Sequence, residues 1–173
     1  MEKILEFLLS IISDVLPFYT IKQYEMGVVL RGGKFLKVTN PGFHFKLPFF
    51  DDVLKSVVVV TTLTIPVQSI TTKDNKDVVI KSVVKYTIDD IKSFILNVYD
   101  AIDAISDTTQ AIIKEQITTK NWSQCTNSNI DNEITKKLRI EVKKWGINVE
   151  KVTLTDIGLI SSIRLFNENI INS

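Results

Sequence analysis

The chain has 173 residues, of which 45% are hydrophobic and 24% are charged, and its formal net charge is +1. This length provides one domain or two small halves packed together, and the recurring aliphatic residues exclude a disordered chain. A net charge so close to zero gives no electrostatic basis for binding nucleic acid, so we expect no nucleic-acid partner.

The first predicted element is an amphipathic helix at the N-terminus. Residues 1–18 read MEKILEFLLSIISDVLPF, and on a helical wheel their charged and hydroxyl side chains share one narrow arc. The apolar side chains fill the wider arc: Ile4, Leu5, Phe7, Leu8, Leu9, Ile11, Ile12, Val15 and Leu16. This run is too short and too charged to cross a bilayer as a straight helix, and Pro17 ends it.

The wheel alone leaves two interpretations of this helix open. In one, the helix lies in the plane of a membrane, with its apolar arc in the acyl boundary and Phe18 at the level of the headgroups. In the other, it packs as a core helix against the domain or another subunit. A signal peptide is disfavoured because Glu6 and Asp14 interrupt the apolar core and no small-residue cleavage site follows.

The chain from residue 20 onward begins with the pattern of β-strands. Valine, threonine and aromatic residues predict strands at residues 27–31, 34–38, 53–70 and 78–88. Glycine, proline and asparagine place turns at residues 32–33, 39–42 and 74–75. Together these elements predict an antiparallel meander.

A shorter strand follows the second turn. Phe43, Phe45 and Leu47 alternate with His44 and Lys46, so this strand has one apolar face and one polar face.

Helical periodicity then replaces the strand pattern. Isoleucines and other apolar residues at steps of three, four and seven predict helices at residues 102–117 and 130–145, and a final strand at 147–154. Ser128 or Asn129 is the expected N-cap of the second helix, and Gly146 is its expected end. The order of strands, helices and strand predicts an α+β domain over residues 20–173, preceded by the N-terminal amphipathic helix of residues 1–19.

The sequence contains no constellation of residues that supports catalysis. Cys125 and His44 are the only cysteine and histidine, and they lie far apart in different predicted elements. No metal-ligand spacing or Ser/His/Asp arrangement is present. The glycine pair before Lys34 has the setting of a hairpin and lacks the spacing of a phosphate-binding loop. We therefore expect a protein that is not an enzyme and has no cofactor and no metal.

Two features suggest an interaction surface. Phe49 and Phe50 follow a proline in a predicted loop, where they either fold into the core or lie exposed against a membrane or a partner. The stretch of valine and threonine at residues 57–64 has no charges. Burial in the core is its default interpretation, and contact with another subunit is the alternative.

Three stretches, taken in order, resemble the SPFH or Band 7 family, which includes stomatin, prohibitin and flotillin. Residues 23–50 read QYEMGVVLRGGKFLKVTNPGFHFKLPFF, residues 72–90 read TKDNKDVVIKSVVKYTIDD, and residues 145–156 read WGINVEKVTLTD. The matching positions are Glu25, Gly27, Val28, Arg31, Gly33, Pro41, Gly42, His44, Pro48, Thr72, Asp74, Val79, Tyr86, Trp145, Gly146, Val149 and Asp156.

The resemblance implies a membrane-attached scaffold. Members of the family attach through an N-terminal segment and self-associate into rings or cages, and several associate with a membrane protease or channel. The implied partners are therefore membrane lipid, further copies of the chain, and a membrane protease or channel. The candidate membrane-binding residues are Ile4, Leu5, Phe7, Leu8, Ile11, Ile12, Val15, Leu16, Phe18, Phe49 and Phe50. The domain is expected on one face of the bilayer, and the few mixed flanking charges do not assign the side.

One departure from the family leaves a second hypothesis open. The sequence ends at Ser173, where the family's long coiled-coil helix would start, so we expect a short form that lacks this helix. The alternative to a self-sufficient scaffold is a small interaction protein that binds and caps, or modulates, a host SPFH complex or its associated membrane protease.

Overall fold

The computed structural model describes residues 17–126 and 129–159. Residues 1–16, which carry most of the predicted amphipathic helix, lie outside the described residues. The elements in chain order are β1 Phe18–Ile21, β2 Glu25–Arg31, β3 Lys34–Thr39, β4 Gly42–Phe45, β5 Asp51–Val57, β6 Thr61–Thr71, β7 Asp77–Ile88, α2 Ile91–Leu96, α3 Ala101–Thr118, α4 Trp122–Cys125, α5 Ile130–Val142, η1 Lys143–Trp145 and β8 Ile147–Leu159. Strands followed by helices and a last strand confirm the predicted α+β class.

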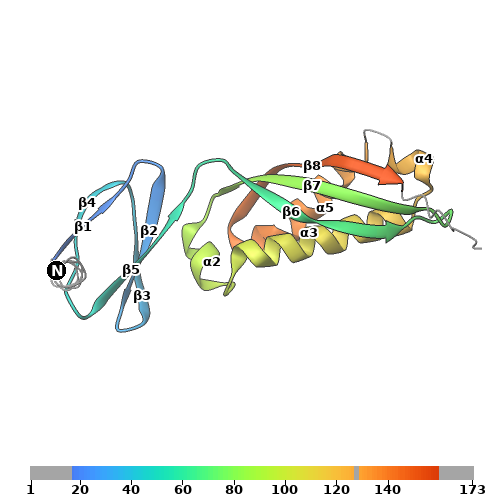
Figure 1. Cartoon of the computed structure of the whole chain (residues 1–173). Helices are drawn as coiled ribbons and strands as arrows, with labels where there is room; N and C mark the ends of the chain where they lie inside the picture. Colours follow the sequence, from blue (N-terminus) through green and yellow to red (C-terminus); the bar gives the residue numbers. More distant parts are fainter. Residues whose placement is uncertain (1–16, 127–128, 160–173) are drawn as a thin grey trace, which may run out of the picture.

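The strands divide among three antiparallel sheets. β1 pairs with β4, β2 lies between β3 and β5, and β7 lies between β6 and β8. The first two sheets lie at one end of the molecule and the third extends toward the other (Figure 1). We call residues 17–60 the β lobe and residues 61–159 the α/β lobe. The predicted extended stretch at 53–70 thus contains two strands, β5 and β6, that belong to different lobes.

The β lobe is held together by a small core between its two sheets. Tyr19 and Ile21 of β1 are buried against Val29 of β2, and the half-buried Val53 of β5 packs beside them. Alternate residues of a strand point to opposite faces. Phe18 and Thr20 therefore lie on the outer face of β1, and their side chains are exposed.

The α/β lobe carries the larger core. Every second residue of β7 is buried, from Val78 to Ile88, as expected for the central strand of a sheet with one covered face. α3 and α5 lie along that sheet (Figure 1), with α3 packed near β6 and α5 near β8. Ile105 and Ile113 of α3 and Leu138 of α5 are fully buried there.

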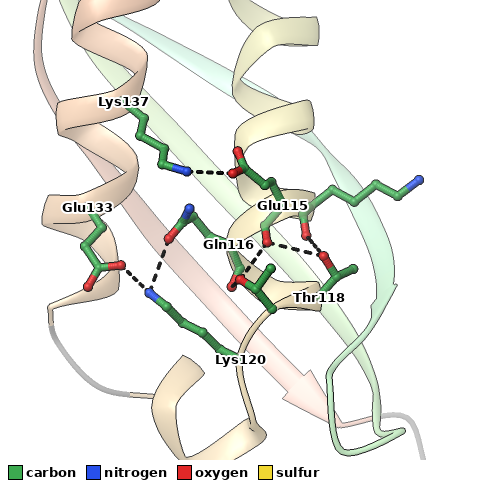
Figure 2. Close-up of polar contacts among 8 residues, drawn as sticks. Glu115, Gln116, Thr118, Lys120, Glu133 and Lys137 are labelled. Carbon is green, nitrogen blue, oxygen red and sulfur yellow. Dashed lines mark hydrogen bonds and ion pairs between the residues drawn. The ribbon is translucent and has the colours of Figure 1, made fainter.

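Polar contacts join the end of α3 to α5. Lys137 Nζ donates to Glu115 Oε1 at 2.7 Å, and Lys120 Nζ contacts both Glu133 and the side-chain oxygen of Gln116 (Figure 2). Ion pairs at the surface contribute little to stability because water screens them. Burial of apolar side chains therefore accounts for the pairing of α3 with α5. The polar contacts hold the C-terminal end of α3 beside α5.

The two lobes meet through α2 and β2. Val28 of β2 is fully buried in the main core, and Met26 and Leu30 of the same strand pack against it. Asp90 caps α2, because its carboxylate accepts hydrogen bonds from the backbone N–H groups of Lys92 and Ser93. The face of β2 opposite the small core is thus covered by the α/β lobe.

Candidate functional site

The outer face of the two-stranded β1–β4 ribbon is aromatic. Phe18 lies directly across from Phe45, and Phe43 lies two residues further along the same face of β4. The ring centroid of Phe18 is 5.1 Å from that of Phe43 and 5.8 Å from that of Phe45. Phe18 is 49% exposed, Phe43 is 69% exposed and Phe45 is 56% exposed. We call these three residues the ribbon cluster.

The opposite face of the ribbon packs against the body of the β lobe. Tyr19 is buried and its ring stacks on that of His44, with 5.4 Å between centroids. His44 Nε2 forms a hydrogen bond with the backbone oxygen of Asn40 at 2.7 Å. An antiparallel ribbon with one covered face ordinarily carries polar side chains on the other. Three exposed phenylalanines on this face make it a candidate contact surface for a membrane or a partner.

The loop between β4 and β5 adds two further aromatic side chains. Phe49 is 86% exposed and Phe50 is 64% exposed, so the interpretation in which both fold into the core is wrong. Phe49 has a φ of +69°, a conformation that bulky residues rarely adopt. The loop is closed by hydrogen bonds from Asp51 N to Leu47 O at 3.0 Å and from Gly32 N to Phe50 O at 2.9 Å. We call Phe49 and Phe50 the loop pair.

A buried carboxylate braces this loop against β2. Asp51 Oδ1 and Oδ2 accept hydrogen bonds from Arg31 Nε and Nη2 at 2.7 and 2.9 Å, and Oδ2 also accepts from Leu47 N at 2.8 Å. A bidentate pairing of this kind fixes geometry as well as adding energy. The Arg31 guanidinium and the Leu47 N–H lower the pKa of Asp51 to about 2. The brace therefore favours the ionised carboxylate.

We predict that Asp51→Asn lowers the melting temperature at neutral pH, and that this difference shrinks in acid. A lowered pKa stabilises the fold fully above the ordinary carboxyl pKa of about 4. That contribution is lost as the pH falls through about 2. Thermal unfolding of the wild type and the variant across this range measures the difference. Asp52→Asn, at the exposed neighbouring position, is the matched control, and a difference independent of pH would contradict the assignment.

The ribbon also marks where the N-terminal segment joins the domain. Lys46 N donates to Pro17 O at 2.7 Å, so Pro17 extends the β1–β4 pairing by one step. Pro17, the first residue that the structure describes, therefore lies at the end of the ribbon beside Lys46. The sequence predicted that Phe18 and Tyr19 belong to the N-terminal helix of residues 1–19, whereas the structure places both in strand β1.

The candidate metal ligands and the cysteine of the described residues were compared with the requirements of a metal site and of an activated thiol. Within residues 17–126 and 129–159, no group of three or more His, Cys, Asp or Glu side chains could hold a metal ion. Cys125 is buried, and burial raises the pKa of its thiol, which is the opposite of what an activated nucleophile requires. In the same part of the chain, every helix is too short or too polar to cross a bilayer.

The structure places three of the predicted membrane-binding residues at the surface of one lobe. Phe18 is in the ribbon cluster, and Phe49 and Phe50 form the loop pair. The remaining eight lie outside the described residues: Ile4, Leu5, Phe7, Leu8, Ile11, Ile12, Val15 and Leu16. Phe43 and Phe45 were not among the candidates, although their alternation with His44 had identified an apolar face.

Known proteins resemble most of the chain. The sequence model of the SPFH domain / Band 7 family matches residues 19–164. An uncharacterized protein of Methanocaldococcus jannaschii is 30% identical over 139 residues, which cover 79% of this chain and 70% of that protein. Mouse stomatin is 29% identical over 80% of this chain. Protein HflC of Buchnera aphidicola is 27% identical over 94% of this chain. The chain spans 50% of that stomatin and 57% of that HflC.

Proposed function

Since this chain belongs to the SPFH domain / Band 7 family, whose members are typically membrane-associated scaffolds, we propose that it is a non-enzymatic scaffold at a membrane. It self-associates into a ring- or cage-like oligomer and organises membrane proteins or lipids. The aromatic outer face of the β1–β4 ribbon is the observation that carries this proposal, because a lipid surface is the partner that such a face fits.

The free-energy argument favours a membrane over water for this face. Burying a phenylalanine side chain away from water contributes about 1.5–3 kcal/mol, and five such side chains are exposed in the ribbon cluster and the loop pair. Aromatic side chains are well suited to the boundary between headgroups and acyl chains. The β lobe would then rest on the membrane with the ribbon and the β4–β5 loop in contact with lipid.

The N-terminal segment supplies the second attachment in this proposal. Its apolar arc lies in the acyl boundary, and its junction at Pro17 beside Lys46 brings that arc and the ribbon cluster to the same membrane. Two weak attachments act together because the second binding event becomes intramolecular. Membrane lipid and further copies of the chain are the proposed partners, with a membrane protease or channel as the cargo that the assembly organises.

Flotation with liposomes, followed by electron microscopy of detergent-extracted protein, tests both parts of the proposal. We expect the full chain to float and to form closed rings or cages. Leu8→Asp combined with Ile12→Asp should reduce the floating fraction several-fold, because charged side chains in the apolar arc oppose its burial in lipid. Ser10→Asp, on the polar arc, is the matched control. A chain that stays at the bottom of the gradient would overturn the membrane assignment, and floating monomers would overturn self-association.

A further inference from the structure

The central sheet of the β lobe, formed by β3, β2 and β5, carries its basic side chains on one face. Residues directly opposite each other in neighbouring strands share a face of the sheet. Lys37 of β3 lies opposite Val29, and Lys34 lies opposite Arg31, two residues further along β2. Lys55 of β5 lies opposite the residue two positions before Val29. Alternate residues of a strand point to the same side, so all four basic residues lie on the face of Val29.

This face is the one that the β1–β4 ribbon covers. Val29 is buried beneath the ribbon with Tyr19 and Ile21, whereas Val28, on the opposite face, is buried in the main core. The ribbon therefore lies on the side of the central sheet away from the α/β lobe (Figure 1). The four basic side chains thus point in the same direction as the aromatic outer face of the ribbon.

The carboxylates of the β lobe do not balance this charge. Asp51 shares the face but is buried and is the salt-bridge partner of Arg31. Asp52 lies opposite Leu30, which packs against the main core, so Asp52 is on the other face. Glu25, at the start of β2, is the third carboxylate and lies on the face of the basic residues. One carboxylate besides the partner of Arg31 therefore accompanies three lysines.

The three lysines of this face present their charge at the surface. Lys34, Lys37 and Lys55 are exposed, and they take part in none of the salt bridges formed among the described residues. The amine of Lys55 donates to Thr20 O at 2.8 Å, which holds it beside β1 of the ribbon. The β lobe has six basic and three acidic residues, whereas the described part of the α/β lobe has thirteen of each. Positive charge is therefore concentrated in the lobe that bears the exposed phenylalanines.

Protection of the sheet edges explains only part of this arrangement. A lysine on an edge strand discourages the addition of a further strand, and β3 and β5 are the edges of the central sheet. Such protection works from either face of the strand, so it gives no reason for every basic residue of the sheet to lie toward the ribbon. A negatively charged surface beyond the ribbon gives that reason.

We propose that the membrane beneath the β lobe is anionic, and that Lys34, Lys37 and Lys55 bind its negatively charged lipid headgroups. This inference rests on the proposed membrane attachment and names the class of lipid. The ribbon is one layer of strands, and packed sheets lie about 10 Å apart. Electrostatic attraction extends over about the same distance at 0.1 M salt, and long lysine side chains extend toward the headgroups. The phenylalanines supply affinity for any bilayer, and the lysines supply the preference for an anionic one.

Vesicle binding by the full chain tests the class of lipid. Vesicles of phosphatidylcholine are compared with vesicles in which a third of the lipid is phosphatidylglycerol. Each lysine near an anionic surface strengthens binding about fivefold, so the anionic vesicles should bind roughly 100-fold more tightly at low salt. About 1 M salt should remove most of this preference, because it shortens the range of the attraction to about 3 Å. Equal binding to both kinds of vesicle would overturn the anionic preference alone, and no binding to either would overturn membrane attachment as well.

Paired substitutions locate the preference on this face. Lys34→Gln with Lys37→Gln should weaken binding to the anionic vesicles about 25-fold and leave binding to phosphatidylcholine vesicles unchanged. Lys81→Gln with Lys85→Gln removes the same charge from exposed positions of β7 in the α/β lobe and should change neither. Equal losses in the two pairs would overturn the assignment to the β lobe. If loss of the edge lysines causes aggregation, Lys55→Gln provides the same test, with an expected loss of about fivefold.

Discussion

Replacing Phe43, Phe45 and Phe49 together by serine should weaken binding to lipid vesicles by about 100-fold and leave the fold intact. If each ring contributes roughly half of the 1.5–3 kcal/mol for complete burial, the three contribute about 3 kcal/mol. A tenfold change in affinity corresponds to about 1.4 kcal/mol. The fold is expected to survive because all three side chains are mostly exposed and lie outside both cores.

Vesicle partitioning measured by sedimentation, over a range of lipid concentrations, gives this ratio directly. The matched control replaces Val67, Tyr99 and Ile140 by serine, since these apolar residues are equally exposed but belong to the α/β lobe. Equal binding by the two triple variants would show that exposed apolar area in general, and not the β1–β4 ribbon, governs attachment. Circular dichroism of both variants separates loss of binding from loss of folding.

The ribbon also shows how far alternation in a sequence can be interpreted. The pattern from Phe43 to Leu47 correctly separates an apolar face from a polar one. It does not say which face meets the body of the protein, because that depends on the strand that pairs with it. β1 brings Tyr19 and Ile21 to the side of His44, so the half-buried histidine faces inward and the phenylalanines face outward.

Local signals predicted the individual elements well, because caps, turns and periodicity are encoded in short stretches. The turn after β2 lies where the glycine pair predicted it, with φ values of +55° and +76° at Gly32 and Gly33. Gly146 ends the helical stretch with a φ of +73°, also as predicted. Asn129 occupies the N-cap of α5, although its side chain makes no capping hydrogen bond.

Pairings between distant residues could not be predicted from these local patterns. The exposure of the loop pair depends on Asp51, whose partner Arg31 lies 20 residues away on another strand. The division of residues 53–70 into β5 and β6 depends on β5 pairing with β2 and β6 with β7. The short helix α2 was also missed, because six residues give too little periodicity to detect.

The second large effect is expected at Gly146, where an added methyl group should strongly destabilise the fold. A Cβ atom at this position would lie 2.1 Å from the backbone oxygen of Asp90. The carbonyl oxygen of Gly146 also accepts hydrogen bonds from Asp89 N at 2.9 Å and Asp90 N at 3.1 Å. Asp90 cannot move away without breaking these bonds and its own cap on α2, where its carboxylate holds Lys92 N and Ser93 N.

Gly33→Ala separates this clash from the cost of the left-handed backbone conformation. Gly33 has a φ of +76° and no atom within 4 Å of an added Cβ. Its alanine variant should therefore lose only about 1 kcal/mol, or roughly 2–4 °C in melting temperature for a chain of this size. Gly146→Ala should lose more than about 4 kcal/mol of folding free energy, beyond the usual range for single substitutions, and more than about 10 °C in melting temperature.

Equal melting temperatures for the two variants would mean that α2 and the start of β8 can move apart at little cost in free energy. The contact between Gly146 and Asp90 lies where β7, α2 and β8 meet. A large difference in melting temperature between the two variants would therefore show that the α/β lobe depends on a close backbone contact that only glycine permits at position 146.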